Sequence, residues 1–165
     1  MLTSIEINKS KTSFLRGVIY SLIILILGFL SGFSTSSEIQ IWFTTIIKPS
    51  FNPPNFIFGP VWTLLYILMG ISFSIIISQK PSVNRTRAII IFAVQFIFNL
   101  MWSVIFFKMH QIGWAFVEIL CMWISILIMI VLFYRSQKIA GLLQIPYLLW
   151  VSFASVLNGS IYYLN

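Results

Sequence analysis

Five long apolar runs dominate the sequence, and they lie at about residues 14–33, 56–78, 88–107, 112–134 and 139–164. A helix needs roughly 20 apolar residues to cross the hydrocarbon core of a bilayer, and each run is about that long. A transmembrane β-barrel would instead show strands of about 10 residues with alternating polarity, and the runs do not alternate. We therefore predict an all-α polytopic membrane protein, a five-helix bundle that forms a single domain over residues 1–165.

The composition excludes a soluble domain. Hydrophobic residues make up 59% of the chain and charged residues only 8%, against about 25% charged residues in a typical soluble domain. The net charge of +7 does not indicate nucleic acid binding, because the basic residues are dispersed through the polar gaps and form no basic face. The single cysteine, Cys121, lies inside an apolar run, and we interpret it as a small core residue.

The ten Lys and Arg residues predict the orientation of the chain. Eight of them lie in the N-terminal tail up to Arg16 or in the gaps after the second and fourth runs. The other two, Lys48 and Lys108, lie in the gaps after the first and third runs. Because cytoplasmic loops carry the excess of positive charge, we expect the N-terminus inside and the C-terminus outside.

The first apolar run follows a basic tail, and this pattern also resembles a secretory signal peptide. That alternative would leave four transmembrane helices after cleavage, but the run is long for the apolar part of a signal. Gly28 and Gly32 give the run a G-x-x-x-G spacing, which permits another helix to approach closely. We favour a contact within the chain over a dimer interface.

The longest polar gap, residues 34–55, is predicted to be a rigid proline-rich loop. Proline fixes φ and removes a backbone donor, so a helix cannot pass through the three prolines of the gap, which are Pro49, Pro53 and Pro54. Trp42 and Phe43 argue that the loop is ordered, either as an aromatic belt at the headgroup level or as a cover over a pocket. Loops of this length in compact proteins are usually functional or disordered.

Aromatic and amide side chains recur at helical spacing in three of the runs. The second run places Trp62 one turn before Tyr66, and the third places Asn99 before Trp102. An amide at membrane depth needs a partner, so Asn99 should face the bundle interior. In the fifth run Pro146 permits a kink, and the small Ala154 lies one turn after Trp150. These stripes predict an apolar pocket with a few polar groups, as is usual for a small-molecule site.

Glu118 and His110 are the two titratable residues near the fourth run that need an interpretation. Glu118 lies inside the run, and an acid at that depth is often functional. We favour an ion pair or hydrogen bond near the interface, because Lys108 and His110 lie in the adjoining gap. His110 lacks the further ligands that a metal site requires, so we interpret it as a solvated loop residue and predict no metal.

The sequence carries no motif of conventional catalysis. It contains no H-E-x-x-H, P-loop, G-x-S-x-G or cysteine cluster, and no pair of acids for general acid–base work. A row of buried charges, which would indicate an ion pathway, is also absent from the sequence. We therefore predict a protein that is not a conventional enzyme and that needs no cofactor, with a small-solute transporter as an alternative.

The motifs of four runs and of the long loop resemble those of the TspO/MBR family, the translocator proteins or peripheral-type benzodiazepine receptors. They are W-F-T-T-I-I-K-P-S-F-N-P-P (Trp42–Pro54), G-P-V-W-T-L-L-Y-I-L-M-G (Gly59–Gly70), F-N-L-M-W-S-V-I-F-F (Phe98–Phe107), G-W-A-F-V-E (Gly113–Glu118) and P-Y-L-L-W-V-S-F-A-S-V-L-N (Pro146–Asn158). They occur in the family order and cover all but the N-terminal segment. Glu118 stands where the family usually has aspartate.

The resemblance implies a five-helix bundle, commonly a homodimer, that binds tetrapyrroles such as protoporphyrin IX and haem, together with hydrophobic drug-like ligands. Some bacterial members are associated with light- and oxygen-dependent porphyrin breakdown, for which Trp62 and Trp150 would be the candidate catalytic residues. Carried over residue by residue, the ligand site comprises Trp42, Phe43, Pro53, Pro54, Trp62, Tyr66, Asn99, Trp102, Trp114, Trp150, Ala154 and Leu157.

The resemblance also bears on sterols and on the membrane. Animal members bind cholesterol through a pattern that needs a basic residue after a helix-five tyrosine, and here Tyr163 is followed only by Leu164 and Asn165. We therefore do not expect cholesterol binding at the C-terminus. The high content of Ile, Phe and Asn favours a bacterial plasma membrane, with a mitochondrial outer membrane as the alternative.

Overall fold

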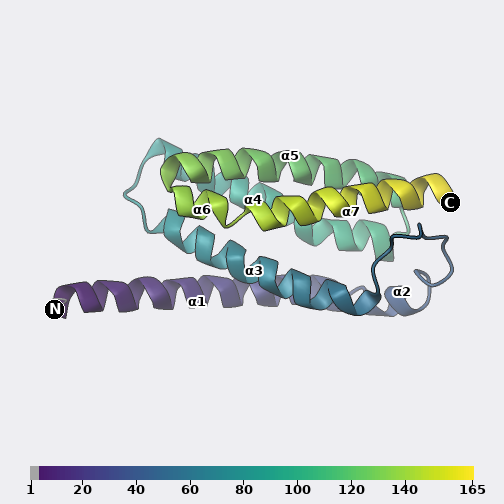
Figure 1. Cartoon of the computed structure of the whole chain (residues 1–165), viewed down its shortest axis with the longest axis horizontal. Coiled ribbons are helices and arrows are strands. Elements are labelled where there is room, and N and C mark those ends of the chain that lie inside the picture. Colours follow the sequence, from purple (N-terminus) through teal and green to yellow (C-terminus); the bar gives the residue numbers. More distant parts are fainter. Residues whose placement is uncertain (1–3) are drawn as a thin grey trace.

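The computed structural model describes residues 4–165, with side chains described from Ser13 onward, and these residues form a bundle of helices (Figure 1). The side chains of Lys9 and Lys11, which entered the prediction of orientation, lie outside the described residues. The elements in chain order are α1 (Ser4–Phe33), α2 (Ser36–Gln40), α3 (Asn55–Ile77), α4 (Val83–Ser103), the π-helix η1 (Val104–Lys108), α5 (Ile112–Ser136), α6 (Lys138–Leu142) and α7 (Ile145–Leu164).

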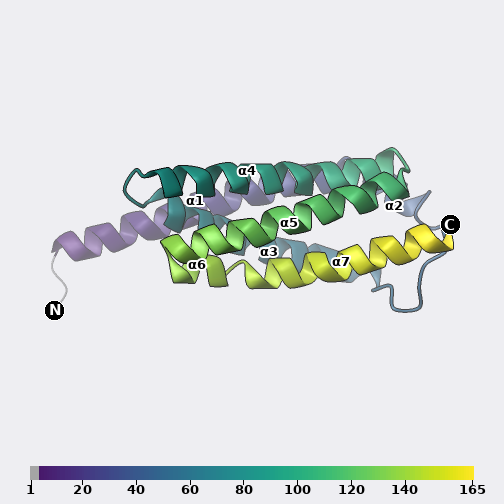
Figure 2. The same ribbon diagram turned by 90° about the horizontal axis from the view of Figure 1, so that it is seen from above.

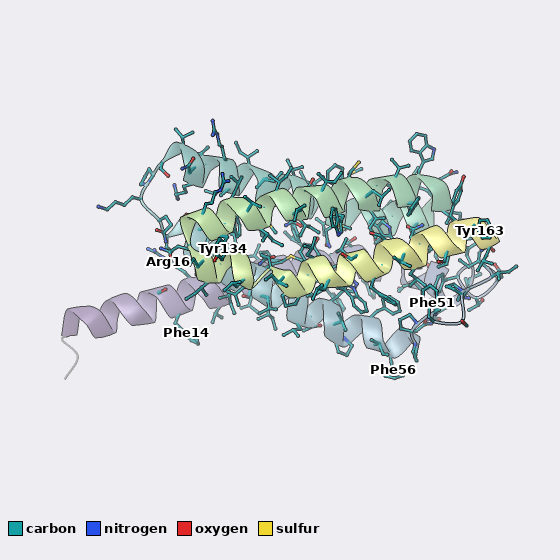
Figure 3. The ribbon with its side chains drawn as sticks, turned by 45° about the horizontal axis from the view of Figure 1, so that its top comes forward. Phe14, Arg16, Phe51, Phe56, Tyr134 and Tyr163 are labelled. Atoms are coloured by element: carbon teal, nitrogen blue, oxygen red, sulfur yellow. The ribbon has the colours of Figure 1, made fainter. Side chains whose placement is uncertain are left out.

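Within the described residues, five helical spans are long and apolar enough to cross a membrane. They correspond to the five predicted runs, so the chain is an integral membrane protein with an all-α fold. The start of α1 and the C-terminus lie at opposite ends of the bundle, as an odd number of crossings requires (Figure 1). The surface is apolar: Phe14 and Phe56 are each 76% exposed and point away from the bundle, which suits contact with lipid (Figure 3).

Two boundaries differ from the prediction for local reasons. α4 begins at Val83, earlier than the expected residue 88, because the side chain of Ser82 accepts a hydrogen bond from the backbone N–H of Arg85 at 3.2 Å and caps the helix. The last span is two helices and not one kinked helix. The break falls at Leu143 and Gln144. Pro146 lies in the first turn of α7, where a backbone N–H has no partner within the helix, so the proline costs no hydrogen bond.

Part of the segment predicted as a loop is helical. Residues 36–40 form α2, and the following residues 41–54 contain no helix. α2 lies at the same end of the bundle as the C-terminus (Figure 1). It contacts η1 at the end of the third span.

The spans pack as a set of neighbouring pairs. α1 packs mainly against α3, α4 packs against α5, and α5 packs in turn against α6 and α7 (Figure 2). The main buried cluster lies where α3, α4, α5 and α7 meet and contains Met69, Phe96, Met122, Tyr147 and Val151. A second cluster lies toward the α2 end and includes Phe43, Phe106 and Leu157. The bundle therefore has a continuous interior into which polar side chains of α4 and α7 also point.

Candidate functional site

The α1–α3 interface is close because small residues lie at its contacts. A Cβ atom at Gly70 would overlap the backbone of Ser21, and one at Gly28 would overlap the ring of Tyr66. Gly32, by contrast, has no atom within 4 Å of its Cβ position. The predicted contact within the chain is thus confirmed for Gly28 and not for Gly32. Small residues let helices approach in a membrane, where apolar lipid gives no hydrophobic drive to association.

The α3–α7 interface has the opposite character, because large rings fill it and the two backbones approach each other far less closely. The ring of Trp62 stacks on Tyr66 at 5.4 Å and meets the ring of Tyr147 edge-on at 6.2 Å. Farther along, Trp150 contacts Phe58 at 5.8 Å and Phe153 at 5.6 Å. Two of the predicted tryptophans therefore lie on facing helices along one seam of aromatic side chains.

The seam is held at one end by two polar contacts between α3 and the α6–α7 region. Ser72 donates a hydrogen bond to the carbonyl oxygen of Ala140 at 2.7 Å, and Gln144 donates one to the carbonyl oxygen of Leu68 at 3.3 Å. Both contacts lie near α6, at the end of the bundle away from α2 (Figure 1). The aromatic part of the seam, around Trp62 and Trp150, lies toward the other end.

Behind the rings, four polar side chains form a chain of hydrogen bonds. Tyr66 donates its hydroxyl proton to Asn99 Oδ1 at 3.0 Å, and Asn99 Nδ2 donates to the Tyr147 hydroxyl at 3.1 Å. Tyr147 in turn donates to Gln95 Oε1 at 3.0 Å. All four residues are buried, and the Nε2 group of Gln95 has no hydrogen-bond partner among the residues with described side chains. The chain supplies the buried Asn99 with the partners that its amide needs.

A second polar contact fixes Trp102 beside the seam. Its Nε1 donates a hydrogen bond to Asn158 Oδ1 at 3.1 Å, and Asn158 donates in turn to the carbonyl oxygen of Ile112 at 3.1 Å. The ring of Trp102 stacks on Phe106 at 4.9 Å. The indole is therefore held by α7 through a hydrogen bond and by η1 through a ring contact.

The segment that follows α2 is attached to the bundle by aromatic contacts. Phe43 is buried against Phe106 and Phe107, and Trp42 stacks on His110 at 4.3 Å. His110 is exposed in the connection between η1 and α5, as predicted, and its Nε2 also bonds Glu38 Oε2 at 3.0 Å. The two-ring stack and the charge of Glu38 explain why the imidazole is held there. An imidazole can do both, because its ring stacks on Trp42 while its Nε2 bonds Glu38.

The rest of this segment lies against the end of α7. The ring of Phe51 meets that of Phe153 at 6.3 Å. The side chain of Asn165 accepts a hydrogen bond from the backbone N–H of Ile47 and donates one to its carbonyl oxygen, each at 2.9 Å. Pro53 is half-buried, whereas Pro54 is exposed at the N-terminus of α3. The segment therefore spans from α2 to α7 before it enters α3.

The structure buries or half-buries most of the predicted site residues but leaves two of them, Pro54 and Trp114, exposed. Ala154 is half-buried and Leu157 is buried on α7, on the same helix as Trp150. Trp114 is 69% exposed and lies on the outer face of α5. The sequence could not place Trp114, because lipid and the bundle interior are both apolar and a tryptophan is compatible with either.

Two residues of the interior were not among the predicted site residues. Tyr147 lies one turn before Trp150, and Gln95 lies one turn before Asn99. Both are on the stripes that the spacing indicates, so the helical period was the signal that could have found them. What the period could not show is that the hydroxyl of Tyr147 joins the two amides.

Two interpretations of single residues are wrong. Cys121 is exposed and is not a core residue. Glu118 is buried at 8% exposure, and neither of its carboxylate oxygens has a hydrogen-bond partner within the described residues. The expected ion pair or hydrogen bond is not present. Among the residues with described side chains, no group of three His, Cys, Asp or Glu residues is placed to hold a metal ion.

Comparisons with known proteins agree with this architecture. The model of the TspO/MBR family matches residues 20–164. The chain is 40% identical to the tryptophan-rich protein TspO of Chlorobaculum tepidum over 86% of this chain and 90% of the relative. It is also 40% identical to the TspO protein of Archaeoglobus fulgidus over 87% of this chain and 93% of the relative. The human translocator protein is 32% identical over 71% of this chain and 70% of its own length. The chain is therefore a member of the TspO/MBR family.

Proposed function

We propose that this chain is an integral membrane receptor or carrier that binds tetrapyrroles, such as protoporphyrin IX and haem, and hydrophobic drug-like ligands in the α3–α7 seam. The observation that carries the proposal is the spacing of α3 and α7 by aromatic rings, with Trp62 on one helix and Trp150 on the other. A planar apolar ligand that enters between these rings exchanges ring–ring contacts for ring–ligand contacts. Such stacking contributes about 0.5–1.5 kcal/mol per pair beyond the buried area.

The attachment of the seam at one end supports this mode of binding. The hydrogen bonds from Ser72 and Gln144 hold α3 near α6, so the helices can separate at the Trp62 and Trp150 end without losing those bonds. Opening a seam that side chains already fill requires only rotamer changes and a small helix movement. The interface of α1 and α3, with its backbone contact at Gly70, would stay closed.

The buried polar chain gives the seam a way to orient its ligand. Tyr66, Asn99 and Tyr147 offer hydroxyl and amide groups in an otherwise apolar surrounding, and the Nε2 of Gln95, which bonds none of the described residues, adds a donor. A tetrapyrrole carries pyrrole N–H groups and ring nitrogens that can pair with such groups. A few fixed polar groups within an apolar wall set orientation and specificity in small-molecule sites.

We further propose that the segment with Trp42, Phe43, Pro53 and Pro54 closes the outer end of the seam, with the ligand's propionates near it. Support comes from its contacts with both helices of the seam: Phe51 contacts Phe153 of α7, and the segment continues directly into α3. Trp102, Ala154 and Leu157 would complete the wall on the α4 and α7 sides. Trp114 is left out of this site, because it lies on the outer face of α5.

Titration with protoporphyrin IX tests the site. Quenching of tryptophan fluorescence in detergent-solubilised protein gives the dissociation constant, which the porphyrin's own absorbance change checks. Trp62→Phe and Trp150→Phe should each weaken binding about fivefold, since each loses about 1 kcal/mol of stacking. Trp114→Phe is the matched control, because it makes the same substitution outside the seam and should leave the affinity unchanged. Unaltered affinity in both seam variants would remove the proposed site.

The same samples separate binding from porphyrin breakdown and from transport. Loss of the pigment's absorbance in light and not in darkness, abolished by Trp150→Phe, would indicate photo-oxidation, the alternative that the family resemblance raises. Flux of a porphyrin across proteoliposomes would indicate transport. Stoichiometric binding with neither effect supports a receptor or carrier.

We propose an orientation with the N-terminus inside, in a bacterial plasma membrane. Among the basic residues with described side chains, Lys80 lies in the α3–α4 connection, Arg85 and Arg87 near the start of α4, and Arg135 and Lys138 at the α5–α6 junction, and Arg16 bonds Ser78 at the end of α3. Lys48, in the segment after α2, and Lys108, in η1, belong to the other end. Two of the more similar relatives are bacterial and archaeal. Reporter fusions to each terminus test the orientation, and cross-linking in membranes tests the homodimer that the family resemblance suggests.

A further inference from the structure

The outer face of the α4–α5 pair carries a hollow of about 460 Å³ that is separate from the α3–α7 seam. Its volume falls within the range of about 300–1,000 Å³ that small-molecule sites occupy. Its wall is apolar apart from Gln111 and Glu118, and it is lined by Phe98, Ile105, Met109, Gln111, Trp114, Val117 and Glu118. Several of these side chains are exposed to the membrane, so a molecule dissolved in the lipid could reach the hollow directly.

Glu118 is the feature of this hollow that the rest of the chain does not explain. Its side chain is 8% exposed, and both carboxylate oxygens lack a hydrogen-bond partner within the described residues. The two basic residues just before α5 do not pair with Glu118. His110 bonds Glu38, and Lys108 is exposed at the end of η1. A buried acid without a partner is costly at membrane depth, where no water replaces the lost hydrogen bonds.

We propose that this hollow binds a membrane-dissolved amphiphile with a primary ammonium head group, whose ammonium pairs with the Glu118 carboxylate. The single acid in an apolar wall is complementary to one compact cation that carries an apolar tail. Both oxygens are covered in this structure, so the Glu118 side chain must turn toward the hollow, where an ammonium group with its three N–H donors can bond both of them. The tail would lie against Phe98, Ile105 and Val117, which are apolar and border the hollow.

The position of Glu118 suits entry from the lipid phase. It lies six residues after Ile112, the first residue of α5, which places it about 9 Å below the start of that helix at 1.5 Å per residue. A head group at this depth is below the water-exposed surface and within reach of a single-chain amphiphile. The exposed ring of Trp114, one turn before Glu118, would cover the head group from the membrane side.

The site is independent of the proposed tetrapyrrole site. Phe98 lines the outer hollow, whereas its neighbour Asn99 points into the bundle and bonds Tyr66 and Tyr147. The two sites therefore use different faces of α4. The two proposals can fail independently, because the tests of the hollow below use no porphyrin.

Native mass spectrometry of the full chain in a neutral detergent tests the proposal with four probes that share a twelve-carbon tail: dodecylamine, dodecyltrimethylammonium, dodecanol and dodecanoate. We expect one saturable molecule of dodecylamine per chain. Dodecyltrimethylammonium keeps the charge but lacks N–H donors, and dodecanol keeps a donor but lacks the charge, so both should bind at least about tenfold more weakly. Dodecanoate should not bind, because its charge repels that of Glu118.

Two variants and a control locate the site. Glu118→Gln keeps the size of the side chain but removes its charge, and should weaken dodecylamine binding at least about tenfold. Val117→Phe fills the hollow without touching the carboxylate and should weaken it as well, which keeps the test decisive if Glu118→Gln does not fold. Glu38→Gln is the matched control, because it removes the acid that pairs with His110, and it should leave the affinity for dodecylamine unchanged.

Three results would overturn the proposal. Equal binding of dodecylamine and dodecanoate would show that the hollow takes any tail. Multiple unsaturable adducts that are the same in all variants would show only partition of the probe into the detergent shell. A dimeric species that loses dodecylamine binding, beside a monomer that retains it, would show that a second copy of the chain is the occupant in the assembled protein.

Discussion

The α1–α3 and α3–α7 interfaces share one helix but are built in opposite ways. On the α1 side, α3 presents Gly70 and the face of Tyr66, and the partner helix approaches until a single methyl group would overlap it. On the α7 side, α3 presents Trp62 and Phe58, and the rings of Tyr147 and Trp150 keep the backbones apart. One interface is closed by backbone contact and the other by side chains.

The difference indicates which part of a membrane bundle can admit a ligand. When two backbones in contact separate, they lose many dispersion contacts at once. Lipid that fills the gap gives no hydrophobic free energy in return, because lipid is itself apolar. Side chains can change rotamer and let a flat molecule take the place of a neighbouring ring. Tyr66 belongs to both interfaces, since one side of its ring meets Gly28 and its hydroxyl bonds Asn99.

The largest effect is expected from Gly70→Ala. The added Cβ overlaps backbone atoms of Ser21, which cannot move without separating α1 from α3. We expect a loss of about 3 kcal/mol in the free energy of unfolding, the upper range for overpacking, measured by denaturation in detergent. Gly32→Ala is the matched control, because no atom lies within 4 Å of its Cβ position, and its stability should not fall. Equal stability of both variants would show that the close interface does not stabilise the bundle.

A smaller effect, about 2 kcal/mol, is expected from Gly28→Ala, because the overlapping atoms belong to the side chain of Tyr66, which can give way in part. The displaced ring would also lose its bond to Asn99 and its stack on Trp62. Affinity for protoporphyrin IX should therefore change in Gly28→Ala but not in Gly32→Ala. Normal affinity in a destabilised Gly28→Ala protein would separate the two interfaces and contradict the shared role of Tyr66.

Tyr147→Phe is expected to cost about 1–2 kcal/mol of stability, because it removes the hydroxyl that accepts from Asn99 and donates to Gln95. The ring and its contact with Trp62 stay, so the spacing of α3 and α7 should be kept. Unfolding in detergent measures the loss. Tyr163→Phe is the matched control, because that side chain is 89% exposed. A loss in the control as large as that in Tyr147→Phe would show that the buried chain contributes nothing specific.

The smallest effect is expected from Asn165→Ala, which removes two hydrogen bonds to Ile47 at an exposed position. Global stability should fall by only about 0.5 kcal/mol, because water replaces the lost partners. Hydrogen exchange of residues 41–54 should nevertheless become faster, since the segment loses its attachment to α7. Unchanged exchange there would show that the aromatic contacts of Phe51 and Phe43 hold the segment by themselves.

Much of the site was accessible from the sequence because helical spacing reports which residues share a face. Trp62 stacks on Tyr66 as their spacing predicts, and Asn99 is buried and Trp102 half-buried on α4, although they bond different partners. The motif resemblance added Trp150, Ala154 and Leu157 on the last span. Trp114 and Cys121 show the limit of the same reasoning, because both lie on apolar stripes and both face outward.

The sequence by itself determined the number of spans, the all-α fold, the family and the residues that share a helical face. Those features depend on the length and polarity of local segments, which hydrogen bonding within each helix and the thickness of the bilayer fix without reference to neighbours. Only the tertiary structure decided which apolar face points inward, that Tyr147 joins Asn99 to Gln95, and that Glu118 has no partner in the part of the chain that the structure describes. The physical reason is that lipid is as apolar as the interior of the bundle. Polarity therefore cannot show which side of a helix faces inward, and only the packing of neighbouring helices decides it.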